Sequence, residues 1–257
     1  MDRHLKFAVL AAEKTGKKLM QYFGKTDVSS RGGGVKTEFD FIADDIIKKG
    51  IEKNFPDYSY LTEETGLVKK NEDYLWVIDP LDGTGNFVNN NPFFSISIAL
   101  WVKGKPVVGV IEAPFLQEKY IATKGGGSWV LKKGQTVQAR VSAAKKLNEA
   151  YIIYCEGGEA NKKRITGIFS KLYPRAKEVR KIGSAALECA WVGLGRADAY
   201  FTTKTNLWDI GAGVLFAKEA GGKILHYDGS PYQWPEFAPE KKYDLTVTNG
   251  KVKMPKL

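Results

Sequence analysis

Apolar residues in the first half of the chain recur first with a helical period and then with a strand period. Over residues 5–23 they form one face of an amphipathic helix that Gly24 ends, and a second such helix covers residues 42–55 and stops before Pro56. Short alternating segments follow, which indicates strands. We expect these at residues 58–62, 75–78, 94–102, 107–112, 119–123 and 128–131. The first half therefore predicts an α+β arrangement with an antiparallel sheet.

From about residue 147, strand and helix patterns alternate, which is typical of an α/β arrangement. We expect strands at residues 151–154, 178–182, 198–202, 223–226 and 245–248, and helices at residues 162–172, 185–194 and 209–220. No linker marks the change of pattern. We therefore predict one domain over residues 1–257, with subdomains at about 1–145 and 146–257.

Composition narrows the class of protein. No apolar run approaches the roughly 20 residues that span a bilayer, and the first residues do not form a secretory signal. Cys155 and Cys189 form no Cys-x-x-Cys pair, which indicates a reducing cytoplasm and no disulfide framework. The net charge of +10 comes from lysines scattered in pairs, so we interpret it as a solvated surface or as steering of anionic substrates. Nucleic acid is not an expected partner, because no recognised motif accompanies the charge.

Candidate chemistry begins where residues 75–78 meet Asp79 and Pro80. We expect the strand to end there, because proline cannot continue a ladder of hydrogen bonds. Asp79 and Asp82 then flank a tight turn, Gly83 permits close approach of a ligand, and Thr84 offers a hydroxyl. This combination suits a hard cation and a phosphate, although alone it also fits an ordinary Asp/Gly turn.

Three further acids stand at the ends of predicted elements. Asp40 lies at the start of the second helix, Glu63 follows a strand, and Asp209 lies at or just before a helix N-terminus. Each has an ordinary explanation as a helix-dipole partner, a solvated turn residue or an N-cap. Their order along the chain is more specific than any one of them.

Taken together, these motifs resemble the inositol monophosphatase family, which belongs to the lithium-sensitive, magnesium-dependent phosphatase superfamily. The resemblance rests on residues 79–87 together with Trp208, Asp209 and Gly213, and it extends over essentially the whole chain. Supporting segments are residues 183–187, 195–200 and 219–222. The resemblance implies a layered αβαβα sandwich, a homodimer, and hydrolysis of small-molecule phosphate monoesters.

The resemblance also implies two to three Mg²⁺ ions in each active site. Glu63, Asp79 and the carbonyl of Leu81 would hold one ion, Asp79, Asp82 and Asp209 a second, and Glu63 a weaker third. Asp40 and Thr84 would orient and deprotonate the attacking water, so that Asp40, Glu63 and Thr84 form the catalytic set. The glycine-rich segment 32–34 would be a flap beside the metals. The residues implied on the substrate side are Asp82, Gly83, Thr84, Arg180, Gly183, Ser184, Ala185, Thr202 and Lys204.

The residue types agree with this chemistry. Magnesium prefers carboxylate oxygen, whereas zinc or phosphohistidine chemistry would have only His4 and His226 to use. Phosphatases of the haloacid-dehalogenase type place their nucleophile in Asp-x-Asp-Gly-Thr. The spacing here is Asp-x-x-Asp-Gly-Thr with an intervening proline, which favours direct attack by water.

The substrate is less determined than the reaction. Inositol-selective members carry an acid at the position of Thr202, and bifunctional archaeal members tend to carry arginine there. Lys204, two residues on, is available for a second phosphate. Inositol 1-phosphate leads, with fructose 1,6-bisphosphate, histidinol phosphate and 3′-phosphoadenosine 5′-phosphate as alternatives. A basic nucleic-acid-binding protein on a degenerate phosphatase fold is the alternative from another class, but every metal-site acid is present.

Overall fold

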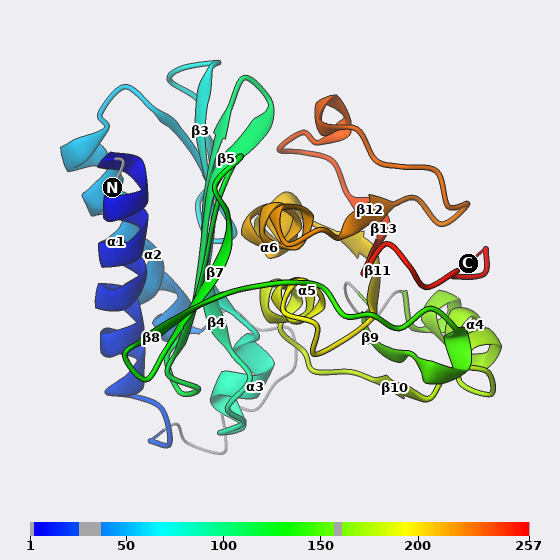
Figure 1. The fold of residues 1–257 in the computed structure, drawn as a ribbon. Helices are drawn as coiled ribbons and strands as arrows, with labels where there is room; N and C mark the ends of the chain where they lie inside the picture. Colours follow the sequence, from blue (N-terminus) through cyan, green and yellow to red (C-terminus); the bar gives the residue numbers. More distant parts are fainter. Residues whose placement is uncertain (1–2, 26–36, 157–160, 257) are drawn as a thin grey trace.

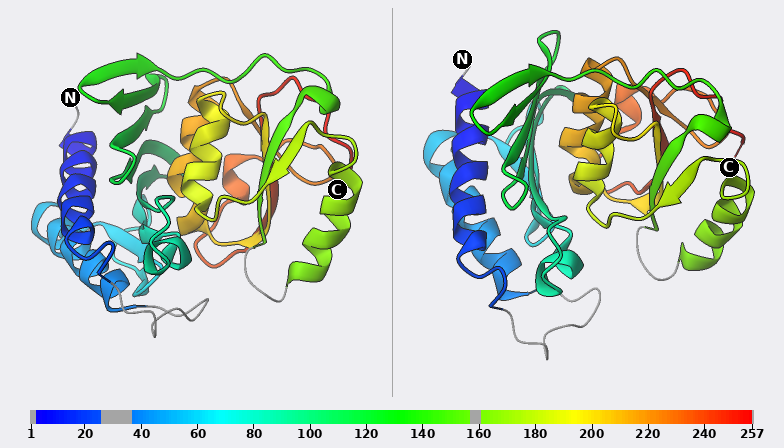
Figure 2. Two further views of the ribbon diagram at one scale, coloured as in Figure 1. Left: turned by 90° about the horizontal axis from the view of Figure 1, so that it is seen from below. Right: turned by 60° about the horizontal axis from the view of Figure 1, so that its bottom comes forward.

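Helices and sheets alternate in five layers in this computed structural model, which describes residues 3–25, 37–156 and 161–256 (Figure 1). Helices α1 and α2 cover the outer face of an eight-stranded sheet, and α5 and α6 fill the space between this sheet and a five-stranded one. Helix α4 lies on the far side of the second sheet (Figure 2). The bounds of the helices are α1 Arg3–Met20, α2 Glu38–Asn54, α3 Thr84–Val88, α4 Lys162–Leu172, α5 Ala185–Gly193 and α6 Leu207–Glu219. The expected αβαβα sandwich is confirmed.

The eight-stranded sheet has the order β2-β1-β3-β4-β5-β6-β7-β8. Its strands are β1 Ser59–Thr62, β2 Gly66–Val68, β3 Tyr74–Asp82, β4 Ser95–Val102, β5 Lys105–Ala113, β6 Glu118–Thr123, β7 Gly127–Lys132 and β8 Gln135–Gln138. Neighbours are antiparallel except β1 and β3, which run parallel. The carboxyl ends of β1 and β3 therefore meet at one edge of the sheet.

The five-stranded sheet has the order β10-β9-β11-β13-β12. Its strands are β9 Tyr151–Cys155, β10 Glu178–Arg180, β11 Ala199–Thr205, β12 Lys223–Leu225 and β13 Tyr243–Thr248. Strands β9, β10 and β11 are parallel, whereas β13 runs antiparallel to β11. Two 3₁₀ turns, Leu147–Glu149 and Trp234–Glu236, lie in the connections.

Helices α5 and α6 are apolar on nearly all faces because they are enclosed by both sheets and by each other. Small residues bring them together. A Cβ atom at Gly213 would lie 2.4 Å from the Cβ of Cys189, so only glycine fits at this crossing. The core around them joins Val77 of the first half to Phe216 of the second. The division at about residue 145 stays a prediction.

Strand β3 differs from the sequence-based expectation. It does not end at Asp79 and Pro80 but continues to Asp82, with a break in register between Asp79, paired with Ser97, and Asp82, paired with Ser95. Two residues on β3 thus oppose one on β4, which is a β-bulge that accommodates the missing N–H of Pro80. The bulge keeps both aspartates within the sheet while changing the direction of their side chains.

Short elements were not predicted. Strands β2 and β8 and helix α3, which have three, four and five residues, were not among the expected elements. The proposed flap at residues 32–34 lies outside the described residues. Both cysteines are free. Among the helices in the described ranges, none has the length and apolarity needed to cross a membrane.

Candidate metal and active site

Three carboxylates converge where the first sheet meets helix α6. Glu63 directly follows β1 and Asp79 lies in the parallel strand β3, so both reach the same sheet edge. Asp209 joins them from the first turn of α6. One carboxylate oxygen of each lies within 4.8 Å of those of the other two. Glu63 and Asp79 are 16 residues apart in the sequence, and the order of the strands brings them together. Asp79 and Asp209 are 130 residues apart, and the packing of α6 against the sheet brings them together.

The electrostatics of this cluster favour a bound cation. Burial, followed by the negative charges of Asp209, Glu64, Asp40 and Asp82, raises the pKa of Glu63 to about 8. Burial and the charges of Glu63 and Asp82 likewise raise the pKa of Asp79 well above its usual range. A divalent cation would reverse this repulsion, and an all-oxygen donor set fits a hard ion such as Mg²⁺. The residues therefore fit the metal that the sequence predicts.

Asp82 lies beside the cluster and is held by four donors. Its Oδ1 accepts the N–H of Ala185 at 3.0 Å, and its Oδ2 accepts the N–H of Ala186 and the hydroxyls of Ser95 and Ser184. Burial raises the pKa of Asp82 to about 6, although the Ser184 and backbone hydrogen bonds oppose the rise. The start of α5 therefore orients this carboxylate. A metal bond from Asp82 would use the remaining acceptor capacity of Oδ1 and stays a prediction.

Asp209 is oriented by the turn that begins α6. The N–H of Asn206, its side-chain amide and the hydroxyl of Thr205 all donate to Oδ2, the first at 2.7 Å. Asn206 is the N-cap of α6 and Asp209 is the third residue of the helix, so Asp209 closes a capping box and is not itself the N-cap that the sequence allowed. Since all three donors use Oδ2, Oδ1 is left to a cation. Capping and metal binding are thus compatible in one side chain.

Asp40 and Thr84 are brought into direct contact although they are 44 residues apart. The Thr84 hydroxyl lies 2.8 Å from Oδ1 of Asp40 and 3.0 Å from the carbonyl oxygen of Leu81, and can donate to either. The other oxygen of Asp40 accepts the N–H of Thr37 at 2.7 Å. The expected catalytic pair is therefore assembled, adjoining the predicted Leu81 ligand.

Gly183 packs against the turn at Gly83, where the sequence predicts phosphate binding. The backbone of Gly83 has φ 88°, and a Cβ there would lie 3.0 Å from the carbonyl oxygen of Gly183. Asn86 ties the two segments together, because its side-chain amide donates to the carbonyls of Phe93 and Ile182. The close approach explains why glycine is needed at residue 83.

Other predicted substrate residues have different surroundings. Ser184 and Ala185 direct a hydroxyl and an N–H to Asp82, so both support a predicted ligand. Arg180 is exposed and ion-paired with Glu178 of its own strand. Thr202 is completely buried, and its hydroxyl has no hydrogen-bond partner among the described residues. Their contacts with a substrate stay predictions.

Two supporting residues were missed from the sequence. Ser95 reaches Asp82 across the β3–β4 pair, and nothing in its local pattern distinguishes it. Glu188 lies in α5 and accepts the N–H groups of Ile182 and Gly183, both at 2.9 Å. An acid inside an otherwise small and apolar helix was the available signal for Glu188.

Comparisons with known proteins agree with this geometry. The sequence pattern of the Inositol monophosphatase family matches residues 1–256. A Thermotoga maritima protein named fructose-1,6-bisphosphatase/inositol-1-monophosphatase is 40% identical over 89% of this chain and 86% of its own. A Pasteurella multocida protein named Nus factor SuhB is 35% identical over 89% of this chain and 87% of its own. The solved structure of a Thermotoga maritima IMPase superposes with a TM-score of 0.82 at 35% identity, covering 97% of this chain and 93% of that one. The chain belongs to the inositol monophosphatase family.

Proposed function

We propose that this phosphatase hydrolyses small phosphate monoesters with the help of Mg²⁺, and that inositol 1-phosphate is its leading substrate. The observation that carries the metal dependence is the convergence of Glu63, Asp79 and Asp209 within 4.8 Å. Family membership supports the reaction class. Fructose 1,6-bisphosphate is the main alternative substrate, because a relative is named for both activities.

In this proposal Glu63, Asp79 and Asp209 hold Mg²⁺, and Asp82 and the Leu81 carbonyl complete a site for two to three ions. Bound Mg²⁺ supplies an activated water and stabilises the leaving alkoxide. The hydrogen bonds to Asp82 and Asp209 fix their carboxylates before the metal arrives. Such preorganisation lowers the cost of ordering the ligands.

Asp40 and Thr84 provide a route for a proton. Because the Thr84 hydroxyl donates to Asp40 or to the Leu81 carbonyl, its lone pairs can accept a hydrogen from an attacking water. The proton can then pass through the hydroxyl to Asp40. The contact of Thr37 holds Asp40 in the orientation that this transfer needs.

The proposal is tested by phosphate release from inositol 1-phosphate by the purified protein. We expect activity with Mg²⁺ and loss of activity in EDTA that added Mg²⁺ restores. Full activity in EDTA would contradict the metal assignment. Trapping a phosphorylated Asp79 during turnover would contradict direct attack by water.

A second candidate function is nucleic-acid binding, which the net charge of +10 favours. It is tested by RNA binding at several salt concentrations, because contacts with phosphates weaken steeply with salt. Salt-dependent RNA binding without phosphatase activity would favour this candidate. A cytoplasmic homodimer remains part of the main proposal, and size-exclusion chromatography with light scattering tests the dimer.

A further inference from the structure

Glu63 lies in the short turn that joins strands β1 and β2. Thr62 pairs with Gly66 across these two strands, so the turn consists of residues 63–65. Gly66 has φ 77°, a conformation that glycine adopts readily at hairpin turns. The N–H of Thr65 donates to the hydroxyl of Thr62 at 2.9 Å, which closes the turn from within. The direction in which Glu63 reaches the other metal acids therefore depends on how this turn is held.

Three polar groups fasten the turn to helix α2. The hydroxyl of Thr65 donates to Oδ2 of Asp44 at 2.7 Å, and the ammonium of Lys48 lies 2.9 Å from the same oxygen. The ammonium also donates to the Thr65 hydroxyl at 2.7 Å, so each of the three groups contacts the other two. Asp44 was not a sequence-based candidate.

The burial of Asp44 separates it from an ordinary ion pair on a helix surface. Asp44 and the neighbouring Asp45 each form an ion pair with the lysine four residues on. Asp45 and Lys49 are 53% and 74% exposed, as is usual for such a pair. Asp44 is 1% exposed, and its Oδ1 is buried without a hydrogen-bond partner among the described residues. Burying a carboxylate is costly unless it is well paired, so the burial of Asp44 indicates that its position matters.

Asp44 and Asp40 lie one helical turn apart on the same side of α2. Asp40 accepts the hydroxyl of Thr84, which follows β3, and Asp44 accepts the hydroxyl of Thr65, which follows β1. Because β1 and β3 are parallel neighbours, one helix contacts the chain beyond the carboxyl ends of both strands. The helix thus fixes the Glu63 turn relative to Asp40, the proposed proton acceptor.

We propose that Asp44 is a positioning residue of the metal site, which acts through Thr65 to hold the turn from which Glu63 reaches the cation. The inference rests on the proposed function, because it takes Glu63 as a ligand of Mg²⁺. Loss of a contact that orients a metal ligand typically weakens metal binding by about tenfold to a hundredfold. Since Asp44 acts on the metal only through the turn, its effect falls on the affinity for Mg²⁺ and not on turnover at saturating Mg²⁺.

Calorimetry with Mg²⁺ and steady-state kinetics at varied Mg²⁺ concentration test this role. We expect Thr65→Val, which removes the hydroxyl at an exposed residue, to weaken Mg²⁺ binding about tenfold or more. Thr65→Ser keeps the hydroxyl and should retain the wild-type affinity. Asp44→Ala should weaken binding at least as much as Thr65→Val, while kcat at saturating Mg²⁺ stays close to wild type. Asp45→Asn is the matched control, because its ion pair has the same spacing but is exposed, and it should leave the affinity unchanged.

Hydrogen exchange of the backbone amides of residues 62–66, measured in EDTA, gives a second readout that needs no metal. Faster exchange in Thr65→Val and Asp44→Ala than in Asp45→Asn would support the positioning role. Wild-type Mg²⁺ affinity in Thr65→Val and Asp44→Ala, or a loss confined to kcat, would overturn it. A wild type that binds no Mg²⁺ would overturn the proposed function instead, and the exchange rates would then decide whether Asp44 holds the turn.

Discussion

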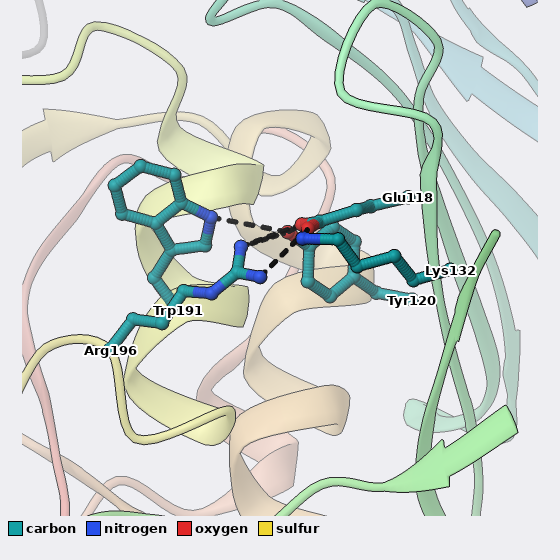
Figure 3. Close-up of polar contacts among 5 residues, drawn as sticks. All are labelled: Glu118, Tyr120, Lys132, Trp191 and Arg196. Atoms are coloured by element: carbon teal, nitrogen blue, oxygen red, sulfur yellow. Dashed lines mark hydrogen bonds and ion pairs between the residues drawn. The ribbon is translucent and has the colours of Figure 1, made fainter. Parts of the chain in front are cut away.

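Two groups of buried carboxylates in this protein have opposite surroundings. Glu118 is 3% exposed. Its carboxylate accepts hydrogen bonds from Nη1 and Nη2 of Arg196, from the ammonium of Lys132 and from the hydroxyl of Tyr120 (Figure 3). Burial alone would raise its pKa, but these hydrogen bonds outweigh burial and bring the pKa to about 2. At Glu63 and Asp79, by contrast, burial and neighbouring carboxylates both raise the pKa.

The difference shows what each group does. Glu118 of β6 finds its cations within the chain and thereby connects the first sheet to Arg196, which follows α5, while Trp191 of α5 donates to Tyr120 at 3.2 Å (Figure 3). Its charge is satisfied, so it holds layers together. The acids around Asp79 remain in mutual repulsion, which a divalent cation would relieve. A buried acid with chain-supplied cations is structural, whereas a cluster of buried acids is a candidate for chemistry.

Asp79→Asn should give the largest effect on activity. It removes a ligand predicted for two ions, so we expect kcat/KM to fall by about a hundredfold to a thousandfold or more, the range seen for loss of a key electrostatic group. Metal-free stability should stay equal or rise, because one repelling charge is gone. Steady-state kinetics and thermal unfolding in EDTA test both halves. A large fall in the unfolding temperature of Asp79→Asn in EDTA would show that Asp79 is structural.

Glu118→Gln should show the opposite pattern. It leaves Arg196 and Lys132 without their carboxylate, and breaking a fully buried pair costs about 3–5 kcal/mol of unfolding free energy. Because Arg196 and Lys132 are 34% and 46% exposed, we expect a smaller loss of about 2 kcal/mol. Urea unfolding measures it, and kcat/KM per folded molecule should change little. A loss of Mg²⁺-dependent turnover larger than that of Asp79→Asn would break the comparison.

The pH dependence of stability should also separate the two groups. The pKa of Glu63 is raised from 4.5 to about 8, so Glu63 binds a proton more tightly in the folded protein than in the unfolded chain. The same holds for Asp82, whose pKa is raised from 3.8 to about 6. The unfolding temperature of the metal-free protein should therefore fall as the pH rises from about 5 to about 8. The pKa of Glu118 is lowered from 4.5 to about 2, so its contribution to stability is lost as the pH falls toward about 2 and not as the pH rises.

Magnesium should reduce this fall, because it replaces the protons on the cluster. The measurement is thermal unfolding at several pH values with Mg²⁺ and with EDTA. Identical slopes in the two conditions would contradict a metal site at Glu63. Some slope should remain with Mg²⁺, since burial also raises the pKa of Glu188 to about 8 away from the three-acid cluster.

Local signals allowed much of this structure to be predicted. The periodic segments around α1, α2 and α6 are long enough for one face or one apolar run to be recognised, and the αβαβα layers followed from the family resemblance. The Asp79–Thr84 motif was recognisable because its residues are contiguous. The bulge in β3 was not, because a proline usually ends a strand unless the partner strand accommodates it.

The residues that were missed act over long sequence distances. Ser95 contacts Asp82 only because β3 and β4 pair in one register. Such contacts are set by tertiary packing, which no local pattern encodes. Thr202 shows the reverse case. The family resemblance identifies it as the position where inositol-selective members carry an acid, but the sequence does not show that it is completely buried.

Glu188 should give the smallest and most selective effect. Its Oε1 accepts the N–H groups of Ile182 and Gly183, whereas Oε2 has no hydrogen-bond partner among the described residues. With a pKa of about 8 it is mostly protonated at neutral pH, so glutamine is a close mimic. Glu188→Gln should therefore change the unfolding free energy by less than about 1 kcal/mol and leave kcat/KM nearly unchanged.

Two comparisons make this last prediction decisive. Glu188→Gln should flatten the slope of stability against pH that remains with Mg²⁺, because the titrating group is gone while its acceptor oxygen stays. Glu188→Ala removes the acceptor as well, so the turn at Gly183, which packs on Gly83, loses its anchor. We expect this variant to raise KM more than it lowers kcat, since the metal acids are untouched. Equal effects of alanine and glutamine on KM would show that Glu188 does not position the turn.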